Sequence, residues 1–290
     1  MAEYVDPRFR PTLWPGTVIP PPAIQPFSNV EVDGDWIRWR PGPTLGQPHR
    51  QLPEDFYLRE LMDTPADDLE AAAALFSTYG LLFSLGGHDI DLVDYPDEVR
   101  DEFAAIPREY PSDDFRFGGV HRDMVTIHLE KAHAATTTWL AWQRVGGLEE
   151  QVEPEVTEEK LVEFNTRNAG AGSPLTLEGL RGFLIEYNLS EMETIIQAAL
   201  APFSIGFGDL SDRNPTVYSV AFLQLYNHMA EGAVARRCEN ETCRRHFVRQ
   251  RGRAEYGQYR TSGVKYCCRE CARAQAQRAL RRRHRAEDGG

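Results

Sequence analysis

Cys238-Glu-Asn-Glu-Thr-Cys243 is the first of two short segments that together hold all five cysteines of this chain. The second segment follows a basic linker and reads Tyr266-Cys267-Cys268-Arg-Glu-Cys271. Two closely spaced cysteine pairs suit a tetrahedral site, because each pair closes a small loop that brings two thiolates to one ion. We therefore predict one structural Zn²⁺ bound by Cys238, Cys243, Cys267 and Cys271.

Two disulfides are the alternative to a metal site. The chain opens with Met1-Ala-Glu-Tyr-Val-Asp-Pro7, which lacks the basic and apolar regions of a secretory signal peptide, so we expect a reducing, cytoplasmic location. An odd number of cysteines also fits four ligands and a spare better than it fits bridges. Zinc is favoured over iron because closed sites of four cysteines without redox neighbours usually hold zinc.

The identity of the spare cysteine stays open at this point. Cys267 and Cys268 are adjacent, and either one could pair with Cys271. Cys267 is preferred because it follows a strand-like segment, Gly263–Tyr266, whereas Cys268 falls where the next helix would begin.

The segment from Cys238 to Arg285, roughly the last sixth of the chain, resembles the treble-clef-like zinc fingers of actinobacterial proteins related to the CGNR group. The resembling features are the Cys-x4-Cys pair, the nearby Phe247, the aromatic-Cys-x3-Cys step and a helix rich in Ala, Gln and Arg. The Cys-Gly-Asn-Arg tetrad of the group reads Cys271-Ala-Arg-Ala274 here, so the likeness is to the group and does not include its signature. The resemblance implies a finger that binds DNA in a transcriptional regulator.

Charge divides the chain into an acidic part and a basic tail. Residues 236–290 carry 16 Lys or Arg against 6 Asp or Glu, a formal charge of +10, which leaves −22 for residues 1–235. A tail of this charge favours an anionic partner, nucleic acid above all. We divide the chain into a Pro-rich arm with a β-hairpin (1–50), an acidic α-helical body (51–235) and a basic zinc finger with a C-terminal helix (236–290).

Basic and amide side chains of the tail form the predicted nucleic-acid-binding surface. On the C-terminal helix we expect a stripe containing Ala272, Ala276 and Ala279 to pack on the finger, and the arginines to face outward toward phosphates or guanine. The predicted contact residues are Arg244, Arg245, Arg249, Arg251, Arg253, Arg260, Lys265, Arg273, Gln275, Arg278, Arg281, Arg282 and Arg285.

The other patterns predict a mainly α-helical protein. Apolar and polar residues alternate in Val30–Val32 and in Trp36–Trp39, on either side of an Asp-Gly-Asp turn. This pattern predicts a β-hairpin. Helical patterns cover residues 54–62, 64–79, 122–145, 151–164, 175–187, 191–200 and 215–228, with residues 122–145 expected to form the longest helix. Residues 81–85 fit either a short strand or a helical continuation, and residues 86–119 an irregular connection with one helical turn near 99–105. The last body helix leads almost directly into Cys238, so the finger is expected to have a defined orientation to the body.

Three functions are compatible with these patterns. We prefer a DNA-binding transcriptional regulator whose body senses a ligand or forms a homodimer. An RNA-binding protein is the second hypothesis, because tyrosines interleave the basic linker. A protein-interaction module, in which the finger binds an acidic surface, is the third.

Enzymatic and membrane functions are not expected. The chain has no Ser-His-Asp arrangement, no nucleotide-binding loop and no HExxH motif, and His128 and His133 are five residues apart and so do not share a helix face. The chain has no uninterrupted run of about 18 apolar residues, so no membrane span is predicted.

Overall fold

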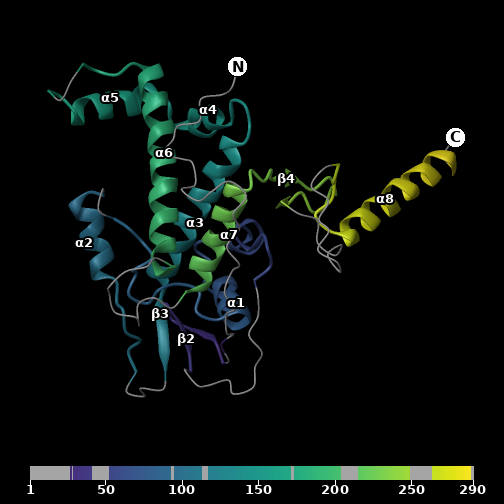
Figure 1. The fold of residues 1–290 in the computed structure, drawn as a ribbon, viewed down its shortest axis with the longest axis horizontal. Helices are drawn as coiled ribbons and strands as arrows, with labels where there is room; N and C mark the ends of the chain where they lie inside the picture. The colour runs from purple at the N-terminus through teal and green to yellow at the C-terminus, as the bar shows by residue number, and fades with distance from the viewer. Residues whose placement is uncertain are drawn as a thin grey trace.

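The computed structural model of the 290-residue chain describes residues 27, 29–40, 52–92, 95–112, 117–170, 173–203, 215–248 and 263–288. Its long helices α3 (Arg122–Trp142), α6 (Leu177–Leu200) and α7 (Val217–Ala230) pack together as the body, with a small sheet at one end (Figure 1). The C-terminal helix α8 (Arg269–Asp288) extends away from this body. The predicted class, mainly α with an N-terminal hairpin and a C-terminal cysteine cluster, is confirmed.

The sheet contains the predicted hairpin and one further strand. Strands β1 (Glu31–Asp33) and β2 (Trp36–Trp39) pair antiparallel around Gly34, whose φ of +61° suits glycine. Strand β3 (Gly118–His121) pairs with the other edge of β2. It was missed because two of its four residues are glycines, which show no alternation of apolar and polar side chains.

Aromatic side chains fill the centre of the body. Trp39 of β2 is only 3% exposed and stacks between Phe27 and Phe76 of α1 (Leu69–Tyr79). Trp139 of α3 packs edge-on against Tyr57 in the single π-helical turn η2 (Tyr57–Leu61). One apolar cluster therefore joins the sheet to the helices.

Helix α7 is the most enclosed element of the body, because its residues from Val217 to Leu225 are all buried. The amides of Val217 and Tyr218 donate to the carbonyls of Leu81 and Leu82, and Thr216 caps the amide of Ser219. Residues 81–85, for which a strand or a helical continuation was predicted, form neither. They are a non-helical segment that provides acceptors for the first turn of α7.

Several helix boundaries differ from the predictions. Helix α6 runs unbroken over 24 residues and is longer than α3, because the predicted break near Ser190 contains neither glycine nor proline. Helix α1 is capped by Asp68, which accepts from the amide of Ala71, rather than by Thr64. The remaining helices of the described residues are α2 (Asp97–Ala105), α4 (Gly147–Val152), η3 (Glu153–Glu155), α5 (Glu158–Arg167) and η4 (Ala201–Phe203).

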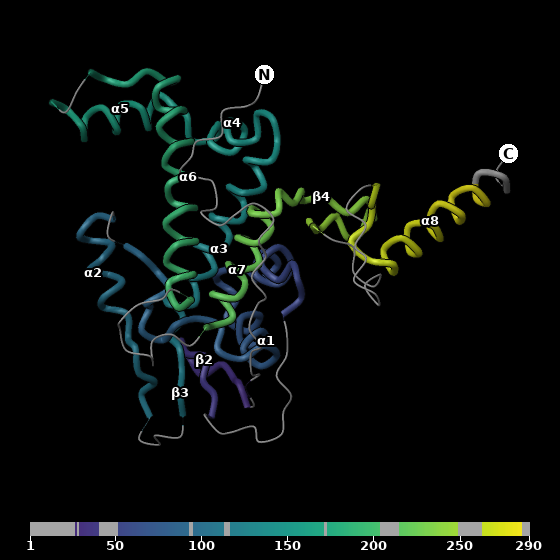
Figure 2. The backbone as a smooth tube through the Cα atoms, in the orientation of Figure 1, coloured from purple at the N-terminus to yellow at the C-terminus, as the bar shows by residue number. Residues whose placement is uncertain are grey.

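Five residues separate the finger from α7, and three kinds of contact attach it to the body. Figure 2 follows this path through β4 (Arg236–Arg237), which pairs with β5 (His246–Phe247). Val248 belongs to the apolar cluster of the body, and the amide of Ala235 donates to Gln143 Oε1 at 2.8 Å. Arg245 forms a 2.9 Å ion pair with Asp63, next to η2. These contacts hold the start of the finger against η2 and the end of α3.

Among the described residues, no helix combines the length and the apolar content that crossing a bilayer requires.

Candidate metal centre and basic helix

The four cysteines predicted from their spacing lie together, with their sulfur atoms all within 4.8 Å of one another. The Sγ–Sγ distances are 3.7 Å between Cys243 and Cys267 and 3.5 Å between Cys267 and Cys271. Sulfurs that share a tetrahedral Zn²⁺ at 2.3 Å lie about 3.8 Å apart, whereas a disulfide bond measures about 2 Å. The cluster therefore fits a bound metal ion and does not fit disulfides.

Backbone hydrogen bonds shape the first cysteine segment and join it to the residues just before the second. The amide of Cys238 donates to the carbonyl of Arg245, and the amide of Glu239 donates to the carbonyl of Lys265. Within the first segment, the amides of Cys243 and Arg244 both donate to the carbonyl of Asn240, which closes a tight turn. We call residues 238–243 the knuckle. It brings Cys238 and Cys243 to one side of the site.

Cys268 is the cysteine that lies outside the four-sulfur group. Its Sγ is 3.9 Å from Cys267 Sγ, and the residue comes directly before α8. Cys271 lies in the first turn of α8, where the helix dipole favours a thiolate. The geometry thus favours Cys267 over Cys268 as the second segment's first ligand.

Burial opposes ionisation of two of these thiols. It is the largest cause that raises the pKa of Cys271 to about 11, and it also raises the pKa of Cys267. At Cys243 burial is outweighed by hydrogen bonds, led by that from the backbone of Arg245, which lower the pKa. Four adjacent thiolates therefore need a cation to compensate their charge, which is the way in which metal binding couples to thiol deprotonation.

Asn240 is a residue of the site that sequence reasoning missed. Its side chain is buried, hydrogen-bonds the thiol of Cys271, and accepts from the amide of Thr242 through Oδ1. Asparagine between two paired cysteines is a common turn residue, and that was the available signal. In this structure it orients a candidate ligand as well as closing the turn.

The face of α8 that packs on the knuckle is polar. Arg282 and Gln275 both contact the carboxylate of Glu241 at 2.9 Å, and Arg278 donates to Thr242 Oγ1 at 2.7 Å. The hydrogen bond from Arg282, followed by that from Gln275, lowers the pKa of Glu241 to about 2.

The predicted packing of the alanine stripe is wrong for Ala276 and Ala279, which are exposed, whereas Ala272 is half-buried. An alanine methyl group offers no hydrogen bond to the polar knuckle, whereas Gln and Arg tips reach its carboxylate, hydroxyl and amide groups.

The predicted nucleic-acid contacts divide into three groups. The first is already engaged within the chain: Gln275, Arg278 and Arg282 at the knuckle, Arg245 with Asp63, and Lys265 with Glu239. The second is exposed: Arg244 in the turn after Cys243, and Arg273, Arg281 and Arg285 on α8. The third lies outside the described residues: Arg249, Arg251, Arg253 and Arg260.

Comparison of the chain with protein-family models, with curated proteins and with solved structures found no match. What its own geometry defines is a mainly helical protein with a C-terminal cluster of four cysteines that could bind a metal ion.

Proposed function

We propose that this protein is a zinc-dependent DNA-binding regulator whose C-terminal finger presents α8 to duplex DNA. One observation carries the proposal: an exposed, arginine-rich helix starts at a candidate metal ligand and extends away from an acidic body (Figure 1). The resemblance of the finger to the CGNR group agrees with this function.

Zinc would have a structural role in this finger. Four sulfur ligands leave no coordination position for water, so we assign the ion no catalytic task. The apolar cluster around the cysteines is small and centres on Phe247, so most of the folding free energy of the finger would come from metal binding.

Duplex DNA is favoured over duplex RNA by the shape of α8. The major groove of B-DNA is about 12 Å wide and admits an α-helix, whereas that of A-form RNA is too narrow for side chains to read. The 20 residues of α8 give a length of about 30 Å. In this proposal Arg273, Arg281 and Arg285 contact the DNA, while Arg278 and Arg282 keep the helix on the knuckle.

The test is a salt-titrated binding assay with the zinc-loaded full chain and a mixed-sequence duplex, read by fluorescence anisotropy. The logarithm of the binding constant should fall linearly with the logarithm of salt concentration. The triple variant Arg273→Gln, Arg281→Gln, Arg285→Gln should bind more weakly and reduce the slope by about 3.

A matched control removes the same charge from the body, through Arg100→Gln, Arg144→Gln and Arg167→Gln, which are exposed there. It should bind as the wild type does. Equal weakening by both triples would reduce the effect to net charge and contradict the role of α8. The absence of measurable duplex binding at low salt would overturn the proposal.

A protein-interaction module is the second candidate, and one contact favours it. Arg245 of the finger pairs with Asp63 of the body, so a basic side chain of the finger already contacts a carboxylate on a protein surface. This candidate would be supported by a chain that binds zinc but, in the same assay, binds neither duplex DNA nor single-stranded or structured RNA.

A further inference from the structure

A second site candidate lies in the body, between α2 and α3. It is a cavity of about 590 Å³ whose walls include the apolar side chains of Val99, Phe103, Ile106 and Ile127. Volumes of several hundred Å³ with mainly apolar walls are typical of small-molecule sites. In Figure 1 α2 lies on the opposite side of the body from α8, so this cavity is separate from the cysteine cluster.

The charges that line the cavity are unbalanced. Glu102 comes from α2, and Asp123 and Glu130 come from α3. Lys131 is the only cation among the described lining residues, and its Nζ is 2.7 Å from Glu191 Oε1 and also donates to the hydroxyl of Tyr95. Because Lys131 is paired with Glu191, these lining carboxylates make the site negative. Asp123 Oδ2 also lies 3.3 Å from His121 Nδ1.

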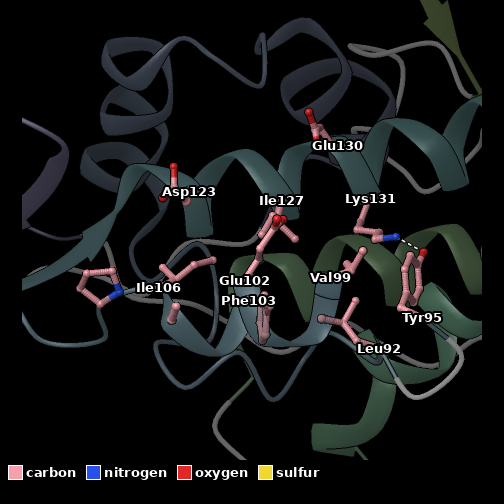
Figure 3. A pocket seen from close by; sticks show the side chains of 12 residues that line it. Leu92, Tyr95, Val99, Glu102, Phe103, Ile106, Asp123, Ile127, Glu130 and Lys131 are labelled. Carbon is pink, nitrogen blue, oxygen red and sulfur yellow. Dashed lines mark hydrogen bonds between the residues drawn. The ribbon is translucent and has the colours of Figure 1, made fainter. Parts of the chain in front are cut away.

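Figure 3 shows how these groups are arranged. Glu102 reaches from α2 toward Ile127 of α3, between the two helices. The side chains of Asp123 and Glu130 project from α3 at separate turns of that helix. Lys131 points to Tyr95 at one end of the cavity. The walls thus combine an apolar surface with carboxylates on both helices.

Two aromatic rings of the cavity already make cation–π contacts with basic side chains of the chain. Lys131 Nζ lies 4.1 Å from the centroid of the Tyr95 ring, and the guanidinium of Arg108 lies 4.5 Å from that of Phe103. Aromatic faces attract cations through the ring quadrupole, and more strongly when water is excluded.

We propose that this cavity binds an organic cation with an apolar body, such as an aryl- or alkyl-substituted ammonium or phosphonium. The apolar walls bury the body of the ligand, and the carboxylates and ring faces stabilise its charge. An organic anion would be repelled by the lining carboxylates, and a simple metal ion would leave the apolar walls unused. The site does not depend on the DNA-binding proposal.

Size-matched probes of different charge test the proposal on the full chain. The probes are tetraphenylphosphonium, neutral triphenylphosphine oxide and tetraphenylborate, measured by isothermal titration calorimetry in sodium buffer. The dissociation constant of the cation should be at least tenfold lower than that of the anion, with the neutral probe between them. Equal or tighter binding of the anion or of the neutral probe would overturn the proposal, and so would binding of none of the three.

Two variants locate the binding. The triple Glu102→Gln, Asp123→Asn, Glu130→Gln should weaken cation binding at least fivefold, and Val99→Trp, at a partly exposed position of the wall, should block every probe. The matched control Asp67→Asn, Glu158→Gln, Glu159→Gln removes the same charge from exposed positions outside the cavity and should bind like the wild type. Wild-type affinity in both site variants, or equal weakening in the control, would contradict the assignment.

Discussion

At the scale of single residues, the core of the body contains a buried histidine–carboxylate pair. His128 Nε2 lies 2.9 Å from Asp89 Oδ1, and both side chains are at most 1% exposed. The second carboxylate oxygen accepts from the amide of Ser84 at 2.9 Å, and His128 Nδ1 lies 2.6 Å from the carbonyl oxygen of Met124. Both ring nitrogens and both carboxylate oxygens of the pair therefore have a hydrogen-bond partner.

Asp89→Asn should lower the free energy of unfolding by about 3 kcal/mol at pH 7, because it leaves a buried partner uncompensated. Urea unfolding, followed by tryptophan fluorescence, measures this loss. The exposed Asp101→Asn is the control and should change the free energy by less than about 0.5 kcal/mol. Equal stability of the two variants would contradict the role of the pair.

The same pair predicts a pH dependence. Burial raises the pKa of Asp89. The charge of His128 and its hydrogen bond to the carboxylate lower that pKa by more, so it lies below its ordinary value. The stabilisation is therefore complete above the unfolded-state pKa of about 3.9 and is lost as the pH falls through the lower folded-state value. Below about pH 5, where this carboxylate is the group that titrates, the difference between wild type and Asp89→Asn should shrink as the pH falls toward about 3. A difference that grows between about pH 5 and about pH 3 would contradict this account.

Tyr218 differs from the His128–Asp89 pair, because its buried hydroxyl has no hydrogen-bond partner within the part of the chain that the structure describes. Tyr218→Phe should leave the free energy of unfolding unchanged or raise it by up to about 1 kcal/mol. Tyr57→Phe is the matched comparison, because the Tyr57 hydroxyl lies 2.7 Å from His228 Nδ1 and its removal should cost about 1 kcal/mol. Urea unfolding of both variants decides. A larger loss for Tyr218→Phe than for Tyr57→Phe would show that its hydroxyl is satisfied.

At the scale of elements, the finger is held together by the packing of α8 on the knuckle. Asn240 connects the two, since its side chain bonds both Cys271 and Arg278. A group that orients a metal ligand in this way usually changes metal affinity about 10- to 100-fold when it is removed.

Asn240→Ala should therefore weaken zinc binding about 10- to 100-fold, with little change in the thermal unfolding of the body. Competition with a chromogenic chelator measures the affinity. Gln277→Ala, at an exposed position of α8, is the control and should bind zinc like the wild type. Unchanged affinity in Asn240→Ala would mean that this side chain closes the turn and nothing more.

The same scale shows where sequence reasoning succeeds. The hairpin was predictable because alternation and an Asp-Gly-Asp turn are local signals, and the cysteine cluster because spacing restricts which sulfurs can meet. Helix propensity did not reveal that α6 is continuous past Ser190, since polar residues such as Asn and Ser are tolerated within a helix that packs on its neighbours. The face of α8 that meets the knuckle depends on Glu241, a residue far away in sequence, so no helical pattern could assign it.

At the scale of the whole molecule, the finger is attached to the body both by opposite charge and by uncharged contacts. A tail of formal charge +10 follows an acidic part of −22, and the ion pair between Arg245 and Asp63 joins the two. Val248 and the Ala235–Gln143 hydrogen bond add a contact that is independent of charge. The body thus sets the position of the finger, while the exposed arginines of α8 extend beyond it.

The most direct test of this account is the zinc content of the purified full chain, measured by mass spectrometry of the metal beside the protein concentration. We expect one zinc per chain in the wild type and in Cys268→Ser, and a loss of zinc in Cys243→Ser and Cys267→Ser. The account would be contradicted by a wild-type chain without stoichiometric metal, or by a Cys268→Ser chain that loses its zinc while Cys267→Ser keeps it.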